Sequence, residues 1–263
     1  MSVLAIDIGN TRVGAGVFTR GKAQDPAVRI AHARLDSDFP PVLRSLWEKA
    51  QAETHELEDS ATEIVIASVA PAATVRVEAL LERELNAAAD VIGRDLAVPL
   101  KTALRDESTV GQDRLLGALA AYVNVEHACA IVQLGTALVV DCIDDEGIFR
   151  GGAIAPGLQM SAKALHDFAA QLPAVSLTPP ESGTPFGRYT QEAINLGLYI
   201  GARGAVRELL ERYAEALGAW PHVVATGGDA PMLLGDSGLV DSFVPDLVLQ
   251  GAALTWEHWR MMS

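Results

Sequence analysis

Residues 4–11 read Leu4-Ala5-Ile6-Asp7-Ile8-Gly9-Asn10-Thr11, an apolar run that ends in a polar turn. An apolar run that stops at Gly-Asn and is followed by a second apolar run over residues 13–18 predicts a β-hairpin. The glycine lets a ligand approach the backbone, and exposed N–H groups beside Asn and Thr suit the binding of phosphate oxygens. Asp7 is placed to hold a hydrated cation there. A hairpin with a turn-forming Gly-Asn explains the same residues equally well.

The same pattern recurs in the second half of the chain. Residues 130–136 read Ala130-Ile131-Val132-Gln133-Leu134-Gly135-Thr136, again an apolar strand with a polar residue two positions before a glycine. The repetition predicts two related halves that face one another, with chance similarity over so few positions as the alternative. A further glycine turn follows a short apolar strand at Thr226-Gly227-Gly228. Each of these turns, taken singly, is explained as well by a loop without function.

Between these motifs the chain alternates strand-like and helix-like segments, which is typical of α/β domains. Apolar spacing predicts helices over 36–55, 72–85, 111–122, 158–172, 190–217 and 247–259, and strands over 64–69, 91–98, 128–134, 137–143 and 223–225. Thr190 is expected to cap the helix that follows it. Asp113 and Arg114 are expected near a helix N-terminus.

The composition excludes several classes of function. The formal net charge of -14 repels phosphate backbones and anionic lipids, so neither nucleic acid nor a membrane is an expected partner. A phosphorylated ligand therefore needs a local device, such as backbone N–H groups, a bound cation or one positioned arginine. The chain has no 18-residue apolar run and no basic start typical of a signal peptide. Its cysteines, Cys129 and Cys142, lie in apolar runs, which fits a reducing compartment and predicts a cytoplasmic protein.

The sequence contains neither a Walker loop nor a dinucleotide-binding GxGxxG loop. Taken together and in order, its motifs resemble those of the type III pantothenate kinase family. The matching stretches are Asp7–Thr11 with Gly16–Phe18, Ala67–Val69 with Pro71, Gly111-Gln112-Asp113-Arg114, Gly135-Thr136-Ala137 with Asp141, Gly151–Ile154 with Pro156-Gly157, Leu172-Pro173, Gly187–Thr190 and Thr226-Gly227-Gly228.

The resemblance implies an α/β fold of two duplicated ribonuclease-H-like domains, as in the actin, sugar kinase and Hsp70 superfamily, with mixed sheets flanked by helices. Residues 1–125 are expected to form the domain with the first phosphate loop and the Gly-x-Asp-Arg motif. Residues 126–263 are expected to form the domain with the second phosphate loop and the adenosine loop.

The implied activity is the ATP-dependent phosphorylation of pantothenate to 4'-phosphopantothenate, the first step of coenzyme A biosynthesis. Asp113 resembles the residue that accepts the proton of the substrate hydroxyl, and Asp7 resembles the residue that orients ATP and Mg²⁺ through water. Thr190 is similar to a substrate contact made across a homodimer interface. The implied ATP-binding residues are Asp7, Ile8, Gly9, Asn10, Thr11, Arg12, Val13, Gly14, Gly135, Thr136, Gly227 and Gly228. The implied substrate-binding residues are Gly111, Gln112, Asp113, Arg114 and Thr190.

The structural alternative for Asp113-Arg114 is an acid at the start of a helix beside an exposed neighbour, and for Thr190 it is a helix cap.

Position 133 departs from the family, which has an aspartate there that binds a required monovalent cation, K⁺ or NH₄⁺. Gln133 offers a cation one amide oxygen and no charge. The family's Asn-Pro pair and Tyr, which shape the pantothenate pocket, have no counterpart in residues 101–109. Two alternatives follow: a degenerate member that binds nucleotide and acts as a regulatory or partner-binding protein, and a kinase for another small hydroxylated acid.

Overall fold

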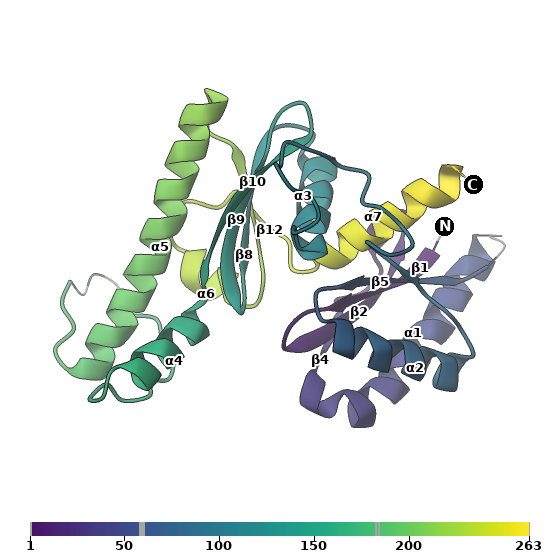
Figure 1. The fold of residues 1–263 in the computed structure, drawn as a ribbon, viewed down its shortest axis with the longest axis horizontal. Helices are drawn as coiled ribbons and strands as arrows, with labels where there is room; N and C mark the ends of the chain where they lie inside the picture. The colour runs from purple at the N-terminus through teal and green to yellow at the C-terminus, as the bar shows by residue number, and fades with distance from the viewer. Residues whose placement is uncertain (1, 58–60, 182, 184, 263) are drawn as a thin grey trace. The chain divides into compact units, whose positions relative to one another are not determined.

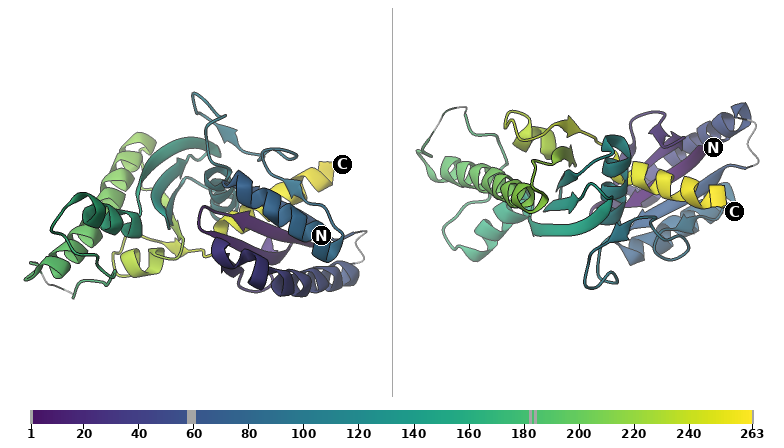
Figure 2. Two further views of the ribbon diagram at one scale, coloured as in Figure 1. Left: turned by 60° about the horizontal axis from the view of Figure 1, so that its bottom comes forward. Right: turned by 90° about the horizontal axis from the view of Figure 1, so that it is seen from above.

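The structure, a computed structural model, describes residues 2–57, 61–181, 183 and 185–262 (Figure 1). The chain forms two compact units: Met1–Asn124 together with Asp246–Ser263 make the first unit, and Val125–Pro245 make the second. The C-terminal segment therefore joins the N-terminal half, whereas the sequence suggested a single division after residue 125. The reason is its helix α7 (Leu247–Met262), which lies against the first unit's sheet (Figure 2). Ala252, Ala253 and Trp256 of this helix are buried there.

The first unit is built on a mixed sheet in the order β3-β2-β1-β5-β6. Its strands are β1 (Ser2–Ile8), β2 (Arg12–Thr19), β3 (Lys22–Ala23), β5 (Glu63–Ser68) and β6 (Asp90–Val91), and β4 (Val28–Ala31) pairs with β2 off this path. β1 and β2 form the expected antiparallel hairpin, and β5 runs parallel to β1. The predicted strand over 91–98 is reduced to β6 and one bridge between Ile92 and Leu96.

Helices cover both faces of this sheet, because alternate residues of each strand are apolar on opposite sides. Leu4, Ile6 and Ile8 pack toward α1 (Leu35–Glu56) and α2 (Pro71–Leu85). Val3 and Ala5 pack toward α7 and α3 (Gln112–Val125). Proline begins α2, and Asn86 in the left-handed conformation ends it. The short elements η1 (His32–Arg34) and β7 (Lys101–Thr102) complete the described part of this region.

The second unit carries a sheet in the order β12-β11-β8-β9-β10. Its strands are β8 (Cys129–Leu134), β9 (Ala137–Ile143), β10 (Ile148–Pro156), β11 (His222–Thr226) and β12 (Ser242–Phe243). Its helices are α4 (Leu158–Phe168), α5 (Thr190–Leu217) and α6 (Ala230–Leu234). Tyr199, Val206 and Leu210 of α5 are buried with the apolar side chains of β8 and β9.

The two sheets have the same topology, which confirms the duplicated fold that the resemblance implied. β1 and β8 occupy equivalent central positions: each pairs antiparallel with the next strand in the chain and parallel with a strand reached by a crossover. The next parallel strand is β6 in one sheet and β12 in the other. The hairpins that carry Asp7 and Gln133 are thus the same structural element used twice.

Two predictions at helix ends were wrong, and one strand was not predicted. The unpredicted strand is β10, over 148–156, in which Gly151 lies at a register shift with a left-handed φ of 87°. The helix expected over 158–172 ends at Phe168. Thr190 is the first residue of α5 and makes no side-chain cap, because Tyr189 occupies the N-cap position. Among the described residues, no helix is long and apolar enough to cross a membrane.

Candidate active site

The first hairpin presents a short polar turn whose backbone is fixed on both sides. The Gly9 N–H donates to the Arg12 carbonyl at 3.0 Å and closes the turn. The Val69 N–H donates to the Ile8 carbonyl at 3.1 Å, so the crossover after β5 supports the end of β1. Asn10, Thr11 and Arg12 are exposed at the tip. Their backbone and side chains are therefore available to a ligand.

The sequence assigned Ile8 and Val13 to the same loop, but their side chains belong to the hydrophobic core. They are paired with one another across the hairpin. Any contact that these two residues make with a nucleotide is consequently limited to their backbone atoms, and their side chains hold the hairpin against α1 and α2.

Asp113 is the second residue of α3, and its side chain folds back toward Gly111, the residue before the helix. Its Oδ1 accepts a hydrogen bond from the Arg114 N–H at 2.9 Å. A Cβ atom on Gly111 would lie 2.5 Å from that same oxygen, so the carboxylate keeps this position only while residue 111 has no side chain. Burial raises the pKa of Asp113, and the Arg114 backbone and charge oppose that rise.

Asp7 and Asp113 lie in the same unit and repel one another. Burial raises the pKa of Asp7 to about 7, with a further contribution from the charge of Asp113, while Arg29 acts in the opposite direction. Paired carboxylates with raised pKa values are typical of functional sites. Their oxygen atoms are also the donors that Mg²⁺ prefers. Within the described ranges, no group of three or more His, Cys, Asp or Glu side chains is arranged to hold a metal. A magnesium ion here would complete its shell with water and phosphate oxygens.

Arg29 and Asp246 also belong to this site, although the sequence did not indicate them. Gly14 is the strand partner of Asp7 on one side and of Arg29 on the other. The Arg29 Nη2 donates to Asp246 Oδ1 at 2.5 Å. These residues are 217 positions apart, and neither lies in a recognisable motif, so only the folded chain reveals the pair.

In the second unit, three glycine turns meet at the equivalent hairpin. The Gly157 N–H donates to the Thr136 carbonyl at 3.1 Å, and a Cβ atom on Gly157 would lie 2.2 Å from the Gly135 carbonyl oxygen. A Cβ atom on Gly227 would lie 2.0 Å from the Leu134 carbonyl oxygen, and Gly227 has a left-handed φ of 96°. Gly228 has open space beside its backbone. Gly135, Thr136, Gly227 and Gly228 are therefore brought together, with Gly157 as an addition that the Pro156-Gly157 motif could have suggested.

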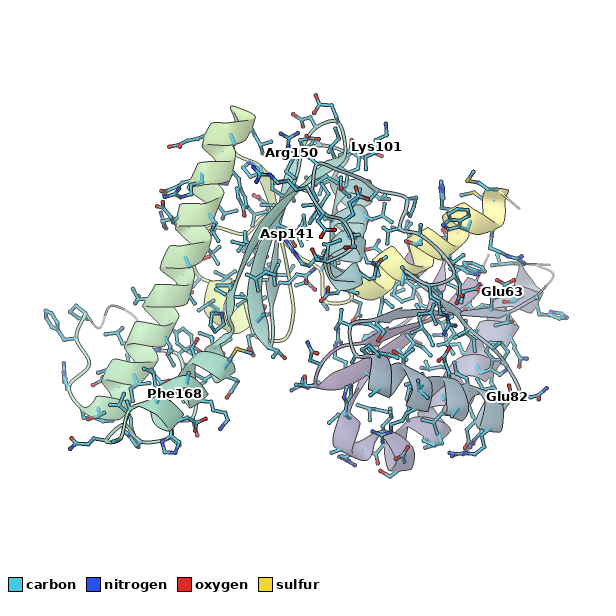
Figure 3. The ribbon with its side chains drawn as sticks, viewed as in Figure 1. Glu63, Glu82, Lys101, Asp141, Arg150 and Phe168 are labelled. Atoms are coloured by element: carbon cyan, nitrogen blue, oxygen red, sulfur yellow. The ribbon has the colours of Figure 1, made fainter. Side chains whose placement is uncertain are left out.

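Gln133 occupies the position equivalent to Asp7. It is half-buried at the end of β8, with Val139 and Thr226 as its strand partners. Asp141 of β9 is fully buried and lies against Gly152, where a Cβ atom would be 2.4 Å from its Oδ1 (Figure 3). Gln133 thus places a neutral amide at the position where the first hairpin has the carboxylate of Asp7. The remaining expected residue, Thr190, is exposed at the start of α5.

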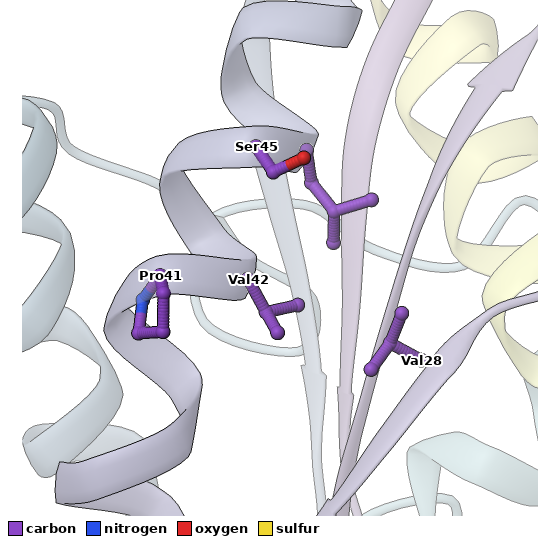
Figure 4. Close-up of a pocket in the computed structure, with 5 residues that line it drawn as sticks. Val28, Pro41, Val42 and Ser45 are labelled. Carbon is purple, nitrogen blue, oxygen red and sulfur yellow. The ribbon is translucent and has the colours of Figure 1, made fainter.

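An apolar hollow of about 280 Å³ lies between β4 and α1 (Figure 4). It is lined by Val28, Pro41, Val42, Ser45 and Leu46. Val28 precedes Arg29 in β4, so the hollow is on the opposite face of the sheet from Asp7. It has no titratable group in its lining and takes no part in the candidate active site.

Comparison with known proteins agrees with this geometry. Residues 3–212 match the family model described as type III pantothenate kinase. A type III pantothenate kinase of Dehalococcoides mccartyi is 34% identical over 97% of both chains, and one of Rhodospirillum rubrum is 36% identical over 95% of both.

Solved structures support the fold. A putative Baf family transcriptional activator from Campylobacter jejuni is similar with a TM-score of 0.58 at 16% identity, covering 99% of this chain and 100% of the other. The activator of the 2-hydroxyisocaproyl-CoA dehydratase from Clostridium difficile, with bound ADPNP, is similar with a TM-score of 0.52 at 13% identity, covering 100% and 97%. The family match across most of the chain and the relatives above 30% identity lead to one assignment: the chain belongs to the type III pantothenate kinase family.

Proposed function

We propose that this protein transfers the γ-phosphoryl group of ATP to the hydroxyl of pantothenate and so catalyses the first step of coenzyme A biosynthesis. The observation that carries the proposal is the meeting of Asp7, from the first hairpin, with Asp113, from the Gly-x-Asp-Arg motif, in one unit of a family member. The chemistry of phosphoryl transfer depends chiefly on positioning and charge neutralisation, which such a pair serves.

Asp113 is assigned the role of general base. In the reaction, the hydroxyl oxygen of pantothenate forms a bond to the γ-phosphorus while the bond from that phosphorus to the bridging oxygen of ADP breaks. The hydroxyl proton passes to a carboxylate oxygen of Asp113. A raised pKa improves a carboxylate as an acceptor near neutral pH. Arg114, next in the helix, is assigned to orient the substrate.

Asp7 is assigned to the magnesium ion that accompanies ATP. When bound, Mg²⁺ neutralises charge on the phosphate oxygens. Asp7 fits a role as its partner through water, because an adjacent cation relieves the repulsion between the two carboxylates. The exposed turn residues Asn10, Thr11 and Arg12 are assigned to the phosphates.

The second unit is assigned to the rest of the nucleotide. Gly135 and Thr136 would contact phosphates through the second hairpin, and Gly227 and Gly228 would lie along the adenosine. The close backbone contact of Gly227 with Leu134 supports this arrangement, because it brings the adenosine loop beside the phosphate loop.

The side chain at position 133 is less suited to a monovalent cation than the aspartate that the family has there. Gln133 supplies no negative charge at the position that carries aspartate in the family. We therefore assign the protein a weakened or absent dependence on K⁺ or NH₄⁺, with no catalytic step depending on that ion.

A homodimer in the cytoplasm completes the proposal. Three aromatic side chains of the second unit are largely exposed: Phe168 (91%), Phe186 (76%) and Tyr189 (65%). Exposed apolar groups of this size are typical of interaction surfaces. Thr190 adjoins them, which agrees with its assignment as a substrate contact at a subunit interface. The charge of -14 supports the absence of nucleic acid and anionic membranes as partners.

The decisive experiment is an assay of ADP release with purified protein, ATP, Mg²⁺ and pantothenate, repeated in sodium, potassium and ammonium salts. Release that depends on pantothenate and is lost in Asp113→Asn supports the kinase. No release in any salt, with ATP binding intact, supports a degenerate member. Release with a different hydroxylated acid and not with pantothenate supports the other alternative, although no observation favours either one.

A further inference from the structure

Arg29 on β4 and Asp7 on β1 lie on either side of β2, which pairs with both strands. Gly14 pairs with both residues, and directly paired residues of neighbouring strands project to the same face of a sheet. Asp7, Gly14 and Arg29 therefore share a face, on which the Leu249 Cδ1 lies 3.7 Å from the position of a Cβ atom on Gly14. The Arg29 Cγ lies 4.0 Å from the position of a Cβ atom on Gly14. The arginine thus passes beside the Leu249 side chain above Gly14, and its positive charge acts to lower the pKa of Asp7.

Asp246 holds the guanidinium of Arg29. One carboxylate oxygen accepts the Arg29 Nη2 at 2.5 Å, and the other accepts the Ala27 N–H at 3.2 Å. The Asp246 side chain is 13% exposed, whereas the Arg29 side chain is 43% exposed. The carboxylate is consequently fixed by the backbone, and the guanidinium that it orients remains accessible to solvent.

The negative charges around the hairpin would be offset by a cationic side chain such as Arg29. Asp7, Asp113 and Asp246 place carboxylates in the first unit's site, and the whole chain carries a net charge of -14. A nucleotide triphosphate that enters this field is repelled unless a positive group neutralises it. A guanidinium offers several N–H donors in one plane and suits phosphate oxygens better than other cationic side chains.

We propose that Arg29 is a phosphate-binding residue of this site, presented by Asp246 to the ATP phosphates beside the Asp7 hairpin. The inference deepens the proposed function and rests on it only for the identity of the nucleotide. Arg29 is in this view a contact of the bound phosphates, and Asp246 is a positioning residue that acts through Arg29.

The first test replaces Arg29 and measures equilibrium binding of Mg-ATP by calorimetry in the absence of pantothenate. Arg29→Gln is expected to weaken ATP binding by about 10- to 100-fold, since a hydrogen bond between charged groups is lost. Arg29→Lys keeps the charge but not the planar fork, so its affinity is expected between the two. Wild-type ATP affinity in Arg29→Gln would overturn the proposal.

The second test asks whether Asp246 acts through Arg29. Asp246→Asn is expected to weaken ATP binding less than Arg29→Gln, because the arginine stays but loses its orientation. The double variant is expected to bind ATP no worse than Arg29→Gln alone. Additive losses would show that Asp246 acts independently and would overturn its assigned role. Should Arg29→Gln not fold, an unchanged ATP affinity in Asp246→Asn would overturn the proposal.

A matched control is the ion pair between Arg44 and Glu84, whose side chains are 50% and 15% exposed and join α1 to α2. Arg44→Gln removes an arginine in a similar environment but on the other face of the sheet. Its ATP affinity is expected to equal the wild-type value, and a loss as large as that of Arg29→Gln would refute a specific role for Arg29. Because binding is measured without pantothenate, failure of pantothenate turnover in the wild type would refute the proposed function and leave this test intact.

Discussion

The carboxylates of Asp7 and Asp113 belong to one site, and the negative charge of Asp113 opposes the ionisation of Asp7. Burial and the charge of Asp113 together raise the pKa of Asp7 to about 7. The two residues come from β1 and from the start of α3, and both elements belong to the first unit. A carboxylate in this position is costly to ionise unless a cation accompanies it. This cost fits the proposed role of Asp7 beside a metal-bound phosphate, and it is measurable in the protein without metal.

We predict that Asp7→Asn stabilises the metal-free protein at alkaline pH. An acid whose pKa is higher in the folded state contributes stability that is complete below its unfolded pKa, near 4, and is lost as the pH rises through about 7. The asparagine variant avoids this loss. In urea unfolding with EDTA, its advantage is expected to grow from pH 5 to pH 8.5 and to reach on the order of 2 kcal/mol.

Asp36→Asn serves as the control, because Asp36 is an exposed partner of Arg76 on the surface of the same unit. Its effect on the free energy of unfolding should be small and should not follow the same pH course. If Asp7→Asn and the wild type have equal stability at pH 8.5, then Asp7 does not have the raised pKa on which this prediction rests.

The proposed catalytic role of Asp113 gives a second prediction. Asp113→Asn should lower kcat for ADP release by about two to four orders of magnitude, the usual contribution of a positioned base. It should leave the affinity for ATP nearly unchanged, because the Arg114 N–H can still donate to an amide oxygen at this position. Steady-state kinetics and calorimetry together check both parts. A variant with wild-type kcat would exclude Asp113 as the base.

Local sequence patterns predicted the hairpins, most helices and the turn residues, because apolar periodicity and glycine turns act over short distances. They could not place α7 in the first unit, since the match between Trp256 and the β1–β5 face depends on residues at opposite ends of the chain. The same limit hid Arg29 and Asp246. Family resemblance supplied the roles of Asp113 and Gln133, which neither spacing nor periodicity could provide. β10 was missed because Gly151 and Gly152, which usually interrupt a strand, here admit a bulge and the close approach of Asp141.

The glycine pair Gly227-Gly228, which we assign to the adenosine, gives a third prediction with its own internal control. Gly227→Ala places a Cβ atom 2.0 Å from the Leu134 carbonyl oxygen at a left-handed φ, so we expect a loss of about 2 to 4 kcal/mol in the free energy of unfolding. Gly228→Ala meets no atom within 4 Å, and its φ is not left-handed, so its stability should stay within about 1 kcal/mol of wild type. Urea unfolding of the two variants compares them. Equal losses would contradict the close packing of Gly227 on the second hairpin.

Gln133 gives a fourth prediction, which concerns the monovalent cation that the family resemblance implies. Gln133→Asp restores the carboxylate at the end of β8, and we expect ADP release by this variant to rise when sodium is replaced by potassium or ammonium. Gln133→Asn keeps a neutral amide and should show no such gain. The measurement is kcat in the three salts at constant ionic strength. No change in cation dependence in Gln133→Asp would show that this position does not govern the cation requirement.

The exposed aromatic groups of the second unit give the last prediction. Phe168 ends α4 and is 91% exposed, so its replacement costs a single chain little stability. If it is covered in a homodimer, Phe168→Glu places a charge in an apolar contact on both copies at once, because a twofold interface repeats each residue. Light scattering after gel filtration should then show a dimer for the wild type and a monomer for the variant at micromolar concentration. Trp220 is 52% exposed and lies just beyond the C-terminal end of α5, whereas Thr190 lies at its N-terminal end. The Trp220→Glu variant should therefore remain dimeric. A wild-type monomer, or a dimeric Phe168→Glu, would remove the interface from the proposal and with it the assignment of Thr190 to a shared substrate site.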